Sequence, residues 1–230
     1  MNKKEGEREM LNKQKGNMYP FVTHTWNAIK GICPHDCKYC YMKVYKQSPL
    51  HFDEKELKVN LGEGNFIFVG SSCDMFAKEV NASWILKVLE HCRKYPNNTY
   101  LFQTKNPRHF IYFKDSYPKD TIFGITLETN RIHLIAGYTK APLSEERVDA
   151  LKVLSDYCHK TMITIEPIMD FDLEIMVKWI KAINPTWVNI GADSKGHNLP
   201  EPSKEKIEAL IKELDKFTEV KKKDNLKRLL

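Results

Sequence analysis

The sequence lacks any long apolar run. Its uninterrupted apolar stretches are only a handful of residues long, far below the roughly 20 that a membrane-spanning helix needs. The first 16 residues mix basic and acidic side chains and contain no apolar segment of the kind found in a secretory signal. We therefore expect a cytoplasmic protein with no membrane partner, whose cysteines are reduced thiols or metal ligands rather than disulfides.

The chain also lacks a strong excess of charge. Its net charge is +6, from 36 Lys and Arg against 30 Asp and Glu, and most of that excess lies near the two ends. Charge runs at chain ends are usually solvated tails. We therefore expect a charged tail over 1–16, one domain over 17–217 and a basic tail over 218–230. This distribution leaves no basic stripe on the domain itself.

Five short β-rich segments are present, without the strict alternation of a half-exposed strand. Strands that are covered on both faces of a parallel sheet have this pattern. The segments are Phe66–Gly70, Tyr100–Thr104, Ile122–Leu127, Met162–Ile165 and Trp187–Ile190. We expect a further strand within 21–29.

Helical patterns separate these strands. We expect one helix capped by Asn81, one capped by Ser144, one over 173–183 and one over 203–217. The spacing of strand starts is that of βα units. Six such units predict an α/β fold, a partial (β/α)6 barrel that is open on one side, because eight would close a full barrel. Residues 50–63 fit no element and are expected to connect into the second strand.

Three of the six cysteines form a cluster, Cys33, Cys37 and Cys40, with the spacing C-x3-C-x2-C. In a reducing compartment, such a cluster favours a metal site over a disulfide framework. A structural zinc site needs four protein ligands, whereas three thiolates on a [4Fe–4S] cluster leave one iron free for a substrate or cofactor. The other helical cysteines, Cys92 and Cys158, are expected to be core residues.

Structural zinc is the alternative for this cluster. In that case His24, His35 or His51 would supply the fourth ligand, although His35 lies between two of the cysteines, where joint ligation is awkward. A zinc site would suggest a non-catalytic binding module that recruits nucleic acid through its termini.

The cysteine spacing, with the aromatic Tyr39 directly before the third cysteine, resembles the signature of the radical SAM superfamily. Further segments resemble a poorly characterised branch of it that is common in phage and mobile-element neighbourhoods, and more distantly the spore photoproduct lyase group. These segments are Trp26-Asn27, FIFVGSSCDMF, Gln103-Thr104-Lys105, GITLETNR and Ile165-Glu166-Pro167. The resemblance covers residues from about 23 to 202.

The resemblance implies two cofactors, a [4Fe–4S] cluster held by Cys33, Cys37 and Cys40, and S-adenosylmethionine (SAM) bound to the open iron. It implies reductive cleavage of SAM to a 5′-deoxyadenosyl radical that removes hydrogen from a substrate. An external one-electron donor of the flavodoxin or ferredoxin type is then required. Tyr39 matches the aromatic position beside the adenine.

The resemblance also assigns side chains to SAM. Members of the superfamily often carry a Gly-Gly-Glu turn that binds the methionine ammonium, where this chain has Gly70-Ser71-Ser72-Cys73-Asp74. Ser71, Ser72 and Asp74 are expected to serve that ammonium instead, and Asp74 is alternatively a helix cap. This departure leaves open a degenerate fold that binds SAM without cleaving it.

Three further residues complete the expected SAM site. Thr126 and Glu128 match positions that hydrogen-bond the SAM ribose. Lys105 is expected to meet the methionine carboxylate or a substrate phosphate.

Two residues are predicted to be catalytic. Glu166 follows a strand and should point toward the barrel mouth, where α/β barrels place their sites; its alternative is a buried partner for a lysine or for backbone amides. Cys73 follows a strand at the same end and could return a hydrogen atom to a product radical, as in repair enzymes of the photoproduct type. We expect a nucleic-acid substrate, or a partner protein that completes the site.

Overall fold

One eight-stranded sheet organises the computed structural model, which describes residues 11–14, 18–157 and 160–230. In spatial order its strands are β1 (Asn12–Lys13), β2 (His24–Trp26), β5 (Phe66–Val69), β6 (Thr99–Thr104), β7 (Thr121–Thr126), β8 (Lys160–Ile165), β9 (Trp187–Ile190) and β10 (Glu219–Lys222). Neighbours from β2 to β10 are parallel, and β1 pairs antiparallel with β2. Because β1 and β10 do not pair with each other, the sheet is open, which confirms the predicted α/β class with an unclosed barrel.

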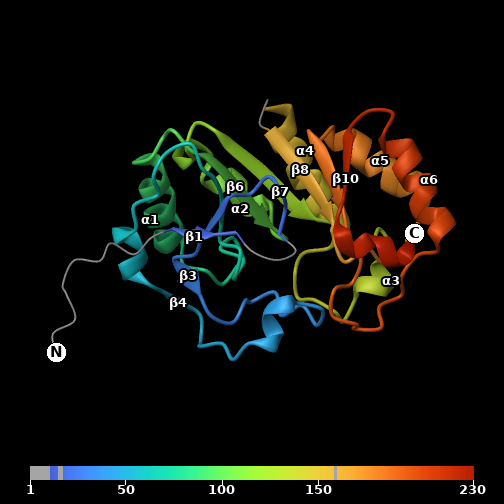
Figure 1. Cartoon of the computed structure of the whole chain (residues 1–230), viewed down its shortest axis with the longest axis horizontal. Helices are drawn as coiled ribbons and strands as arrows, with labels where there is room; N and C mark the ends of the chain where they lie inside the picture. The colour runs from blue at the N-terminus through green and yellow to red at the C-terminus, as the bar shows by residue number, and fades with distance from the viewer. Residues whose placement is uncertain (1–10, 15–17, 158–159) are drawn as a thin grey trace.

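In the described ranges, six α-helices lie between the strands along the chain. They are α1 (Ala82–Arg93), α2 (Arg108–Tyr112), α3 (Ile132–Ile135), α4 (Ser144–Asp156), α5 (Leu173–Ile183) and α6 (Lys204–Leu214). The 3-10 helices are η1 (Tyr41–Val44), η2 (Glu54–Lys58), η3 (Lys114–Ser116) and η4 (Asp224–Leu229), and β3 (Ile29–Lys30) pairs with β4 (His51–Phe52). In Figure 1 the longer helices α4, α5 and α6 follow one another along the outside of strands β8 and β10. No helix in the described ranges is long and apolar enough to cross a membrane.

The predicted helices are present, but one predicted cap is wrong. Asn81 caps α1 by accepting a hydrogen bond from the Ser83 amide at 2.9 Å. Ser144, by contrast, is the first helical residue of α4, and the capping position is Leu143, whose amide donates to the Glu146 carboxylate at 2.9 Å. Helix α4 begins at Ser144 because the Glu146 carboxylate accepts the hydrogen bond of the Leu143 amide at its amino-terminal end. Cys158 lies outside the described residues.

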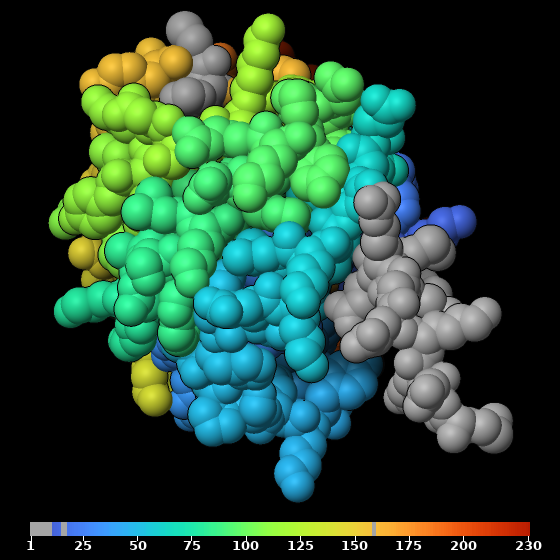
Figure 2. Space-filling model, turned by 90° about the vertical axis from the view of Figure 1, so that its left-hand side faces the viewer, coloured from blue at the N-terminus to red at the C-terminus, as the bar shows by residue number. Residues whose placement is uncertain are grey.

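The segment 50–63 connects into β5 and packs on α1. The imidazole of His91 in α1 bonds the Val59 carbonyl oxygen at 2.9 Å, and the rings of Phe52 and Trp84 stack with their centroids 6.1 Å apart. Figure 2 shows this side of the molecule, with the blue and cyan connection lying against the green segment that follows it. The connection therefore covers the start of the sheet.

The two faces of the sheet have different coverings. On the outer face, strand residues such as Ile67 and Ile163 pack against the helices in the main apolar core. On the inner face, Phe68, Leu101, Ile122, Met162 and Trp187 form a second cluster, closed by the N-terminal residues Tyr19 and Val22. The alternation of side chains along each strand sends successive residues to opposite faces.

The predicted C-terminal tail over 218–230 is wrong in the structure. Strand β10 pairs in parallel with β9, and Leu226 in η4 is fully buried. The sequence of β10 is polar, so it carries no apolar strand signal. The strand forms because β9 supplies backbone partners, and because the amino group of Lys221 lies 4.5 Å from the centre of the Trp187 ring. Of the predicted N-terminal tail, Asn12–Lys13 form the edge strand β1.

We expect Leu226→Ala to lower the free energy of unfolding by about 2–4 kcal/mol, because it opens a cavity in a fully buried site. Urea denaturation measures this. The matched control is Leu86→Ala in α1, where the side chain is 46% exposed and the expected change is within about 0.5 kcal/mol. Equal stability of the Leu226→Ala protein and the parent would mean that the chain end does not belong to the core.

Candidate active site

The inner face of the sheet becomes polar toward the carboxyl ends of its strands. Beyond the apolar cluster lie Gln103, Thr126, Thr164 and Asn189. The Tyr19 hydroxyl bonds Gln103 at 2.9 Å and Thr164 at 2.8 Å, and Gln103 in turn donates to Thr126 at 3.0 Å. This gradient leads to the end of the sheet where α/β barrels carry their sites.

The cysteine loop lies at this end. Cys33, Cys37 and Cys40 span eight residues, and two turns shape them, since the Asp36 amide donates to the Cys33 carbonyl and the Cys40 amide to the Cys37 carbonyl, each at 3.1 Å. Gly31 enters the loop with φ +102°, and a Cβ there would lie 2.4 Å from the Pro49 carbonyl oxygen. Only glycine suits that approach.

The thiol of Cys73 lies against that of Cys33. A hydrogen bond between the two lowers the pKa of Cys33 to about 6 and raises the pKa of Cys73. Cys73 is buried, at the end of the turn after β5. Cys73 follows β5, as predicted, and lies beside Cys33 of the cysteine loop, while its predicted role stays a prediction.

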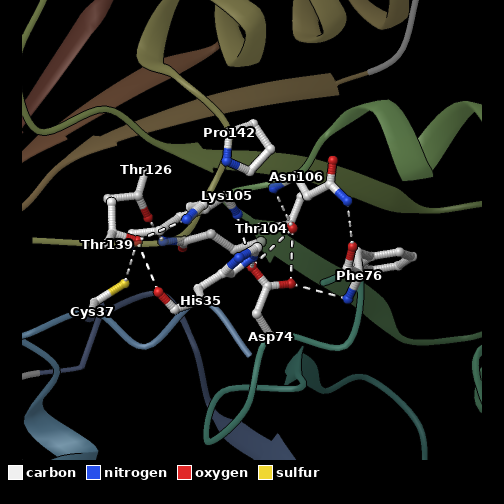
Figure 3. A network of polar contacts seen from close by, with 12 residues as sticks. His35, Cys37, Asp74, Phe76, Thr104, Lys105, Asn106, Thr126, Thr139 and Pro142 are labelled. Carbon is white, nitrogen blue, oxygen red and sulfur yellow. Dashed lines mark hydrogen bonds and ion pairs between the residues drawn. The ribbon is translucent and has the colours of Figure 1, made fainter. Parts of the chain in front are cut away.

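Asp74 organises the polar contacts beside the loop, as Figure 3 shows. Its carboxylate accepts hydrogen bonds from the His35 imidazole at 2.9 Å, the Thr104 hydroxyl at 2.8 Å, and the amides of Lys105 at 2.8 Å and Phe76 at 3.0 Å. Burial alone would raise the pKa of Asp74, but His35 and these donors hold it below its ordinary value. Asp74 caps its own turn rather than α1, and a SAM ammonium would have to replace one of these donors.

Glu128 is the second buried carboxylate of the site. Its side chain is wholly inaccessible and contacts three residues: it accepts a hydrogen bond from the Tyr39 hydroxyl, pairs with Arg147 at 2.7 Å, and lies 3.3 Å from the Lys105 amino group. Arg147 is also fully buried and donates to the Thr126 carbonyl at 2.9 Å. The network thus joins β6, β7, α4 and the cysteine loop.

The cations decide the charge state of Glu128. Burial raises a carboxyl pKa, but Arg147 and Lys105 outweigh it and lower the pKa of Glu128 to about 2. The same carboxylate, together with burial, raises the pKa of Tyr39. Lys105 also lies over the Tyr39 ring, 5.7 Å from its centre. Glu128 therefore fixes both Tyr39, which belongs to the cysteine loop, and Lys105. The predicted contact of Glu128 with the SAM ribose stays a prediction.

The turn that replaces Gly-Gly-Glu is fastened to β2. The Ser71 hydroxyl and the Ser72 amide both donate to the Asn27 side-chain oxygen, at 3.2 and 3.0 Å. Gly70 begins the turn with φ +79°. Ser71 and Ser72 are half-buried, so they reach solvent at the mouth, whereas the predicted ribose ligand Thr126 is buried in the inner-face network.

Glu166 follows β8 as predicted, and the structure gives it a lysine partner. Its carboxylate pairs with Lys223 at 2.6 Å and accepts from the Asn225 amide at 2.8 Å. Both partners come from the C-terminal segment 218–230, which was predicted to be a tail. The alternative interpretation of Glu166, as a partner for a lysine, is thus observed, and its catalytic role stays a prediction.

The cysteine loop fits an iron–sulfur cluster by the chemistry of its donors. Three thiols lie on one loop of eight residues, and thiolates are the ligands of [4Fe–4S] clusters. In the described part of the chain, no group of three or more His, Cys, Asp and Glu side chains is gathered as a single metal ion requires. Of the candidate zinc ligands, His35 is paired with Asp74, and His24 and His51 bond Thr23 and the Pro49 carbonyl at 2.9 Å.

Sequence reasoning missed several residues of this site. Arg147 and Lys223 lie in a helix and a polar segment far along the chain, where nothing local marks an inward cation. Thr139 bonds the Cys37 thiol at 3.2 Å from a loop with no pattern. His35 was detectable only through its place between two cysteines.

Solved structures share this fold at low sequence identity. A spore photoproduct lyase variant with bound AdoMet and dinucleoside spore photoproduct has a TM-score of 0.69 and 11% identity, over 90% of this chain and 78% of that one. SuiB of Streptococcus suis bound to S-adenosylmethionine has a TM-score of 0.62 and 9% identity, over 89% of this chain and 51% of that one. The likeness shows the fold, which is that of radical SAM enzymes.

Sequence comparisons place the chain in a family without assigning an activity. No curated protein sequence matches it, and the predicted phage branch stays a prediction. Residues 18–213 match the family described as "Protein of unknown function (DUF5131)". Since this match spans most of its length, the chain belongs to the DUF5131 family.

Proposed function

We propose that this protein is a radical SAM enzyme. The observation that carries the proposal is the position of the cysteine loop, over the carboxyl ends of an open parallel sheet whose fold is that of radical SAM enzymes. Cys33, Cys37 and Cys40 would each hold one iron of a [4Fe–4S] cluster, leaving the fourth iron for SAM. The proposal includes a cytoplasmic location, where the three ligand thiols would stay reduced.

When bound by Cys33, Cys37 and Cys40, the cluster together with SAM would supply the radical chemistry, a one-electron reductive cleavage of SAM that leads to removal of a hydrogen atom from the substrate. The electron comes from an external flavodoxin- or ferredoxin-type donor. The protein binds and orients the reactants and excludes water. The buried partners of the cysteine loop, Asp74 and Glu128, support this task because they fix the loop through side chains that are themselves held by several bonds.

We propose that some residues of the site contact SAM and that others hold those residues in place. Ser71 and Ser72 reach the mouth and are proposed to serve the methionine ammonium with their hydroxyls and carbonyls. Lys105 supplies a cation for the methionine carboxylate, and the Tyr39 ring lies beside it for the adenine. Asp74, Thr126 and Glu128 already have several protein partners, so we propose that they act mainly by positioning these groups.

Two residues face the substrate in this proposal. The Cys73 thiol, beside Cys33, can give a hydrogen atom to a carbon-centred product radical: the S–H bond breaks, a C–H bond forms, and the sulfur radical left behind is returned to thiol by an electron from the external donor and a proton. Glu166, paired with Lys223, supplies polarity at the mouth. Nucleic acid is the proposed substrate class, supported by the dinucleoside photoproduct bound to the lyase of the same fold.

Replacing any one of Cys33, Cys37 and Cys40 by Ala should remove most bound iron after anaerobic reconstitution, and with it SAM cleavage to 5′-deoxyadenosine, because each thiolate holds one iron. Iron analysis and chromatography of the cleavage products measure the two effects. Cys92→Ala, in the core of α1, is the control and should keep both.

The Cys73→Ala protein sharpens this test, because Cys73 is the thiol closest to the loop without belonging to it. It should keep its iron and still cleave SAM. A full iron complement in the Cys37→Ala protein would refute the ligand assignment, and loss of iron in the Cys73→Ala protein would make Cys73 a ligand.

We expect Glu128→Gln to lower the free energy of unfolding by about 3–5 kcal/mol at pH 7, because it leaves the buried cations of Arg147 and Lys105 without their counter-charge. Urea unfolding of the metal-free chain measures this. Since the pKa of Glu128 is lowered to about 2, its stabilisation is full above the unfolded value of about 4.3 and is lost as the pH falls toward 2. The gap between variant and parent should therefore narrow only below about pH 4.

Glu90→Gln, at an exposed position of α1, is the matched control and should change stability little at any pH. A constant gap from pH 7 to pH 3 would contradict the charge argument. SAM binding to the loaded Glu128→Gln protein separates the ribose contact that the resemblance implies from the positioning role proposed above. A charged acceptor contributes about 1.5–3 kcal/mol, so SAM binding weakened about 10- to 100-fold with an unchanged cluster spectrum would assign the ribose contact, whereas a changed cluster spectrum would support positioning of the loop.

A further inference from the structure

A hydroxyl group lies beside the middle cysteine of the cysteine loop. The sulfurs at the two ends of the loop accept hydrogen bonds from backbone amides, that of Asp74 for Cys33 and that of Met42 for Cys40. Cys37 has a side-chain partner instead, because the Thr139 oxygen lies 3.2 Å from its sulfur. Thr139 belongs to the segment between α3 and α4, and none of the proposed SAM contacts uses it.

The backbone on either side of Thr139 holds its hydroxyl in this position. Two hydrogen bonds join segment 138–140 to the cysteine loop, from the Lys38 amide to the Tyr138 carbonyl at 2.8 Å and from the Lys140 amide to the His35 carbonyl at 2.7 Å. The Ala141 amide also donates to the Thr139 hydroxyl at 3.1 Å. Figure 3 shows Thr139 between Cys37 and His35. The contact with Cys37 is therefore fixed by bonds that do not involve the sulfur.

The surroundings of this contact are apolar. Cys37 is 8% exposed and packs in a small cluster with the side chains of Tyr39, Ile135, Met169 and Leu199. A hydrogen bond is electrostatically stronger in such surroundings than in water. The Thr139 hydroxyl is thus placed where a bond to sulfur has a large effect.

The Thr139 hydroxyl has one proton and two acceptors within reach. While Cys37 is a thiol, it can donate to Thr139, and Thr139 donates to the His35 carbonyl at 3.1 Å. A cysteine that binds a metal has lost its proton, so the bond to its sulfur then requires the proton of the hydroxyl. The His35 carbonyl can release that proton, because it also accepts from the Lys140 amide. The bond to an ionised sulfur is also the stronger of the two.

We propose that Thr139 is a positioning residue that acts through Cys37 and raises the reduction potential of the bound cluster. The inference rests on the proposed function, which supplies the cluster. Hydrogen bonds to the sulfurs are among the factors that set iron–sulfur potentials. Reduction adds one negative charge, so a bond donated to a ligand sulfur is stronger in the reduced state and favours it. Thr139 thereby makes the cluster easier to reduce.

The test compares two pairs of side chains that differ chiefly by the hydroxyl: the parent with Thr139→Val, and Thr139→Ser with Thr139→Ala. Each full chain is reconstituted anaerobically, and a redox titration without SAM is followed by the EPR signal of the reduced cluster. In each pair, loss of the hydroxyl should lower the equilibrium constant for one-electron reduction about three- to tenfold, where tenfold corresponds to about 59 mV in midpoint potential. Thr139→Ser should keep the potential of the parent, because it keeps the hydroxyl.

Thr121→Val is the matched control. It removes a buried hydroxyl that donates to the Pro118 carbonyl at 2.8 Å, at the amino-terminal end of β7. Because parallel strands place the cysteine loop at their carboxyl ends, this variant should keep the potential of the parent.

Iron content separates the inference from the function on which it rests. A parent protein that binds no iron would defeat the proposed function and this inference together. Iron-loaded proteins with equal potentials within both pairs would overturn the inference alone. So would a potential of Thr139→Ser as low as that of Thr139→Val, since packing rather than the hydroxyl would then be the cause. If Thr139→Val fails to hold the cluster, the comparison of serine with alanine decides.

Discussion

The buried carboxylate of Glu128 is the interaction on which the site depends. An isolated buried charge is costly, and this one is retained because Arg147, Lys105 and the Tyr39 hydroxyl all contact it. The three partners come from α4, from the end of β6 and from the cysteine loop. The loop is therefore positioned by the interior of the protein rather than by its own turns alone, and removing the charge would affect every element that meets there.

Asp74 repeats this arrangement two strands away in the sheet, after β5. It too follows a strand of the sheet, and it collects His35, Thr104 and the Lys105 amide. Lys105 thus stands between the two carboxylates, its backbone bonded to one and its amino group beside the other. Because His35 lies between two of the loop cysteines, both carboxylates hold the same loop from different sides. Such paired anchoring fixes the shape of the loop from within the protein, and under the proposed function it would reduce the entropy lost when the cluster binds.

The sequence was most informative where a pattern is local. Apolar segments between turn residues located β5 to β9, and the cysteine spacing located the loop, because both signals lie within a few neighbouring residues. Strand β10 was missed because its residues are polar and its stability comes from pairing with β9. The roles of Arg147 and Lys223 were missed for the same reason: an inward cation is identified by its partner, and Glu128 and Glu166 are far away in the chain. Conversely, Ser144 is of a residue type that often caps helices, but the capping position of α4 is Leu143, whose amide donates to the Glu146 carboxylate.

The cysteines of the loop have two different surroundings, and under the proposed function these would meet different requirements of the chemistry. Cys33 lies against Cys73, whereas Cys37 contacts the Thr139 hydroxyl, which also donates to the His35 carbonyl. An enzyme that generates a radical must exclude water and stray donors from the reacting atoms, yet its cofactor has to be reduced from outside. Under the proposed function, the side of the loop with Cys33 and Cys73 would face SAM and the substrate, while Cys37 on the other side is held by Thr139. The geometry of the loop, more than the size of the domain, then sets what chemistry the fold can carry.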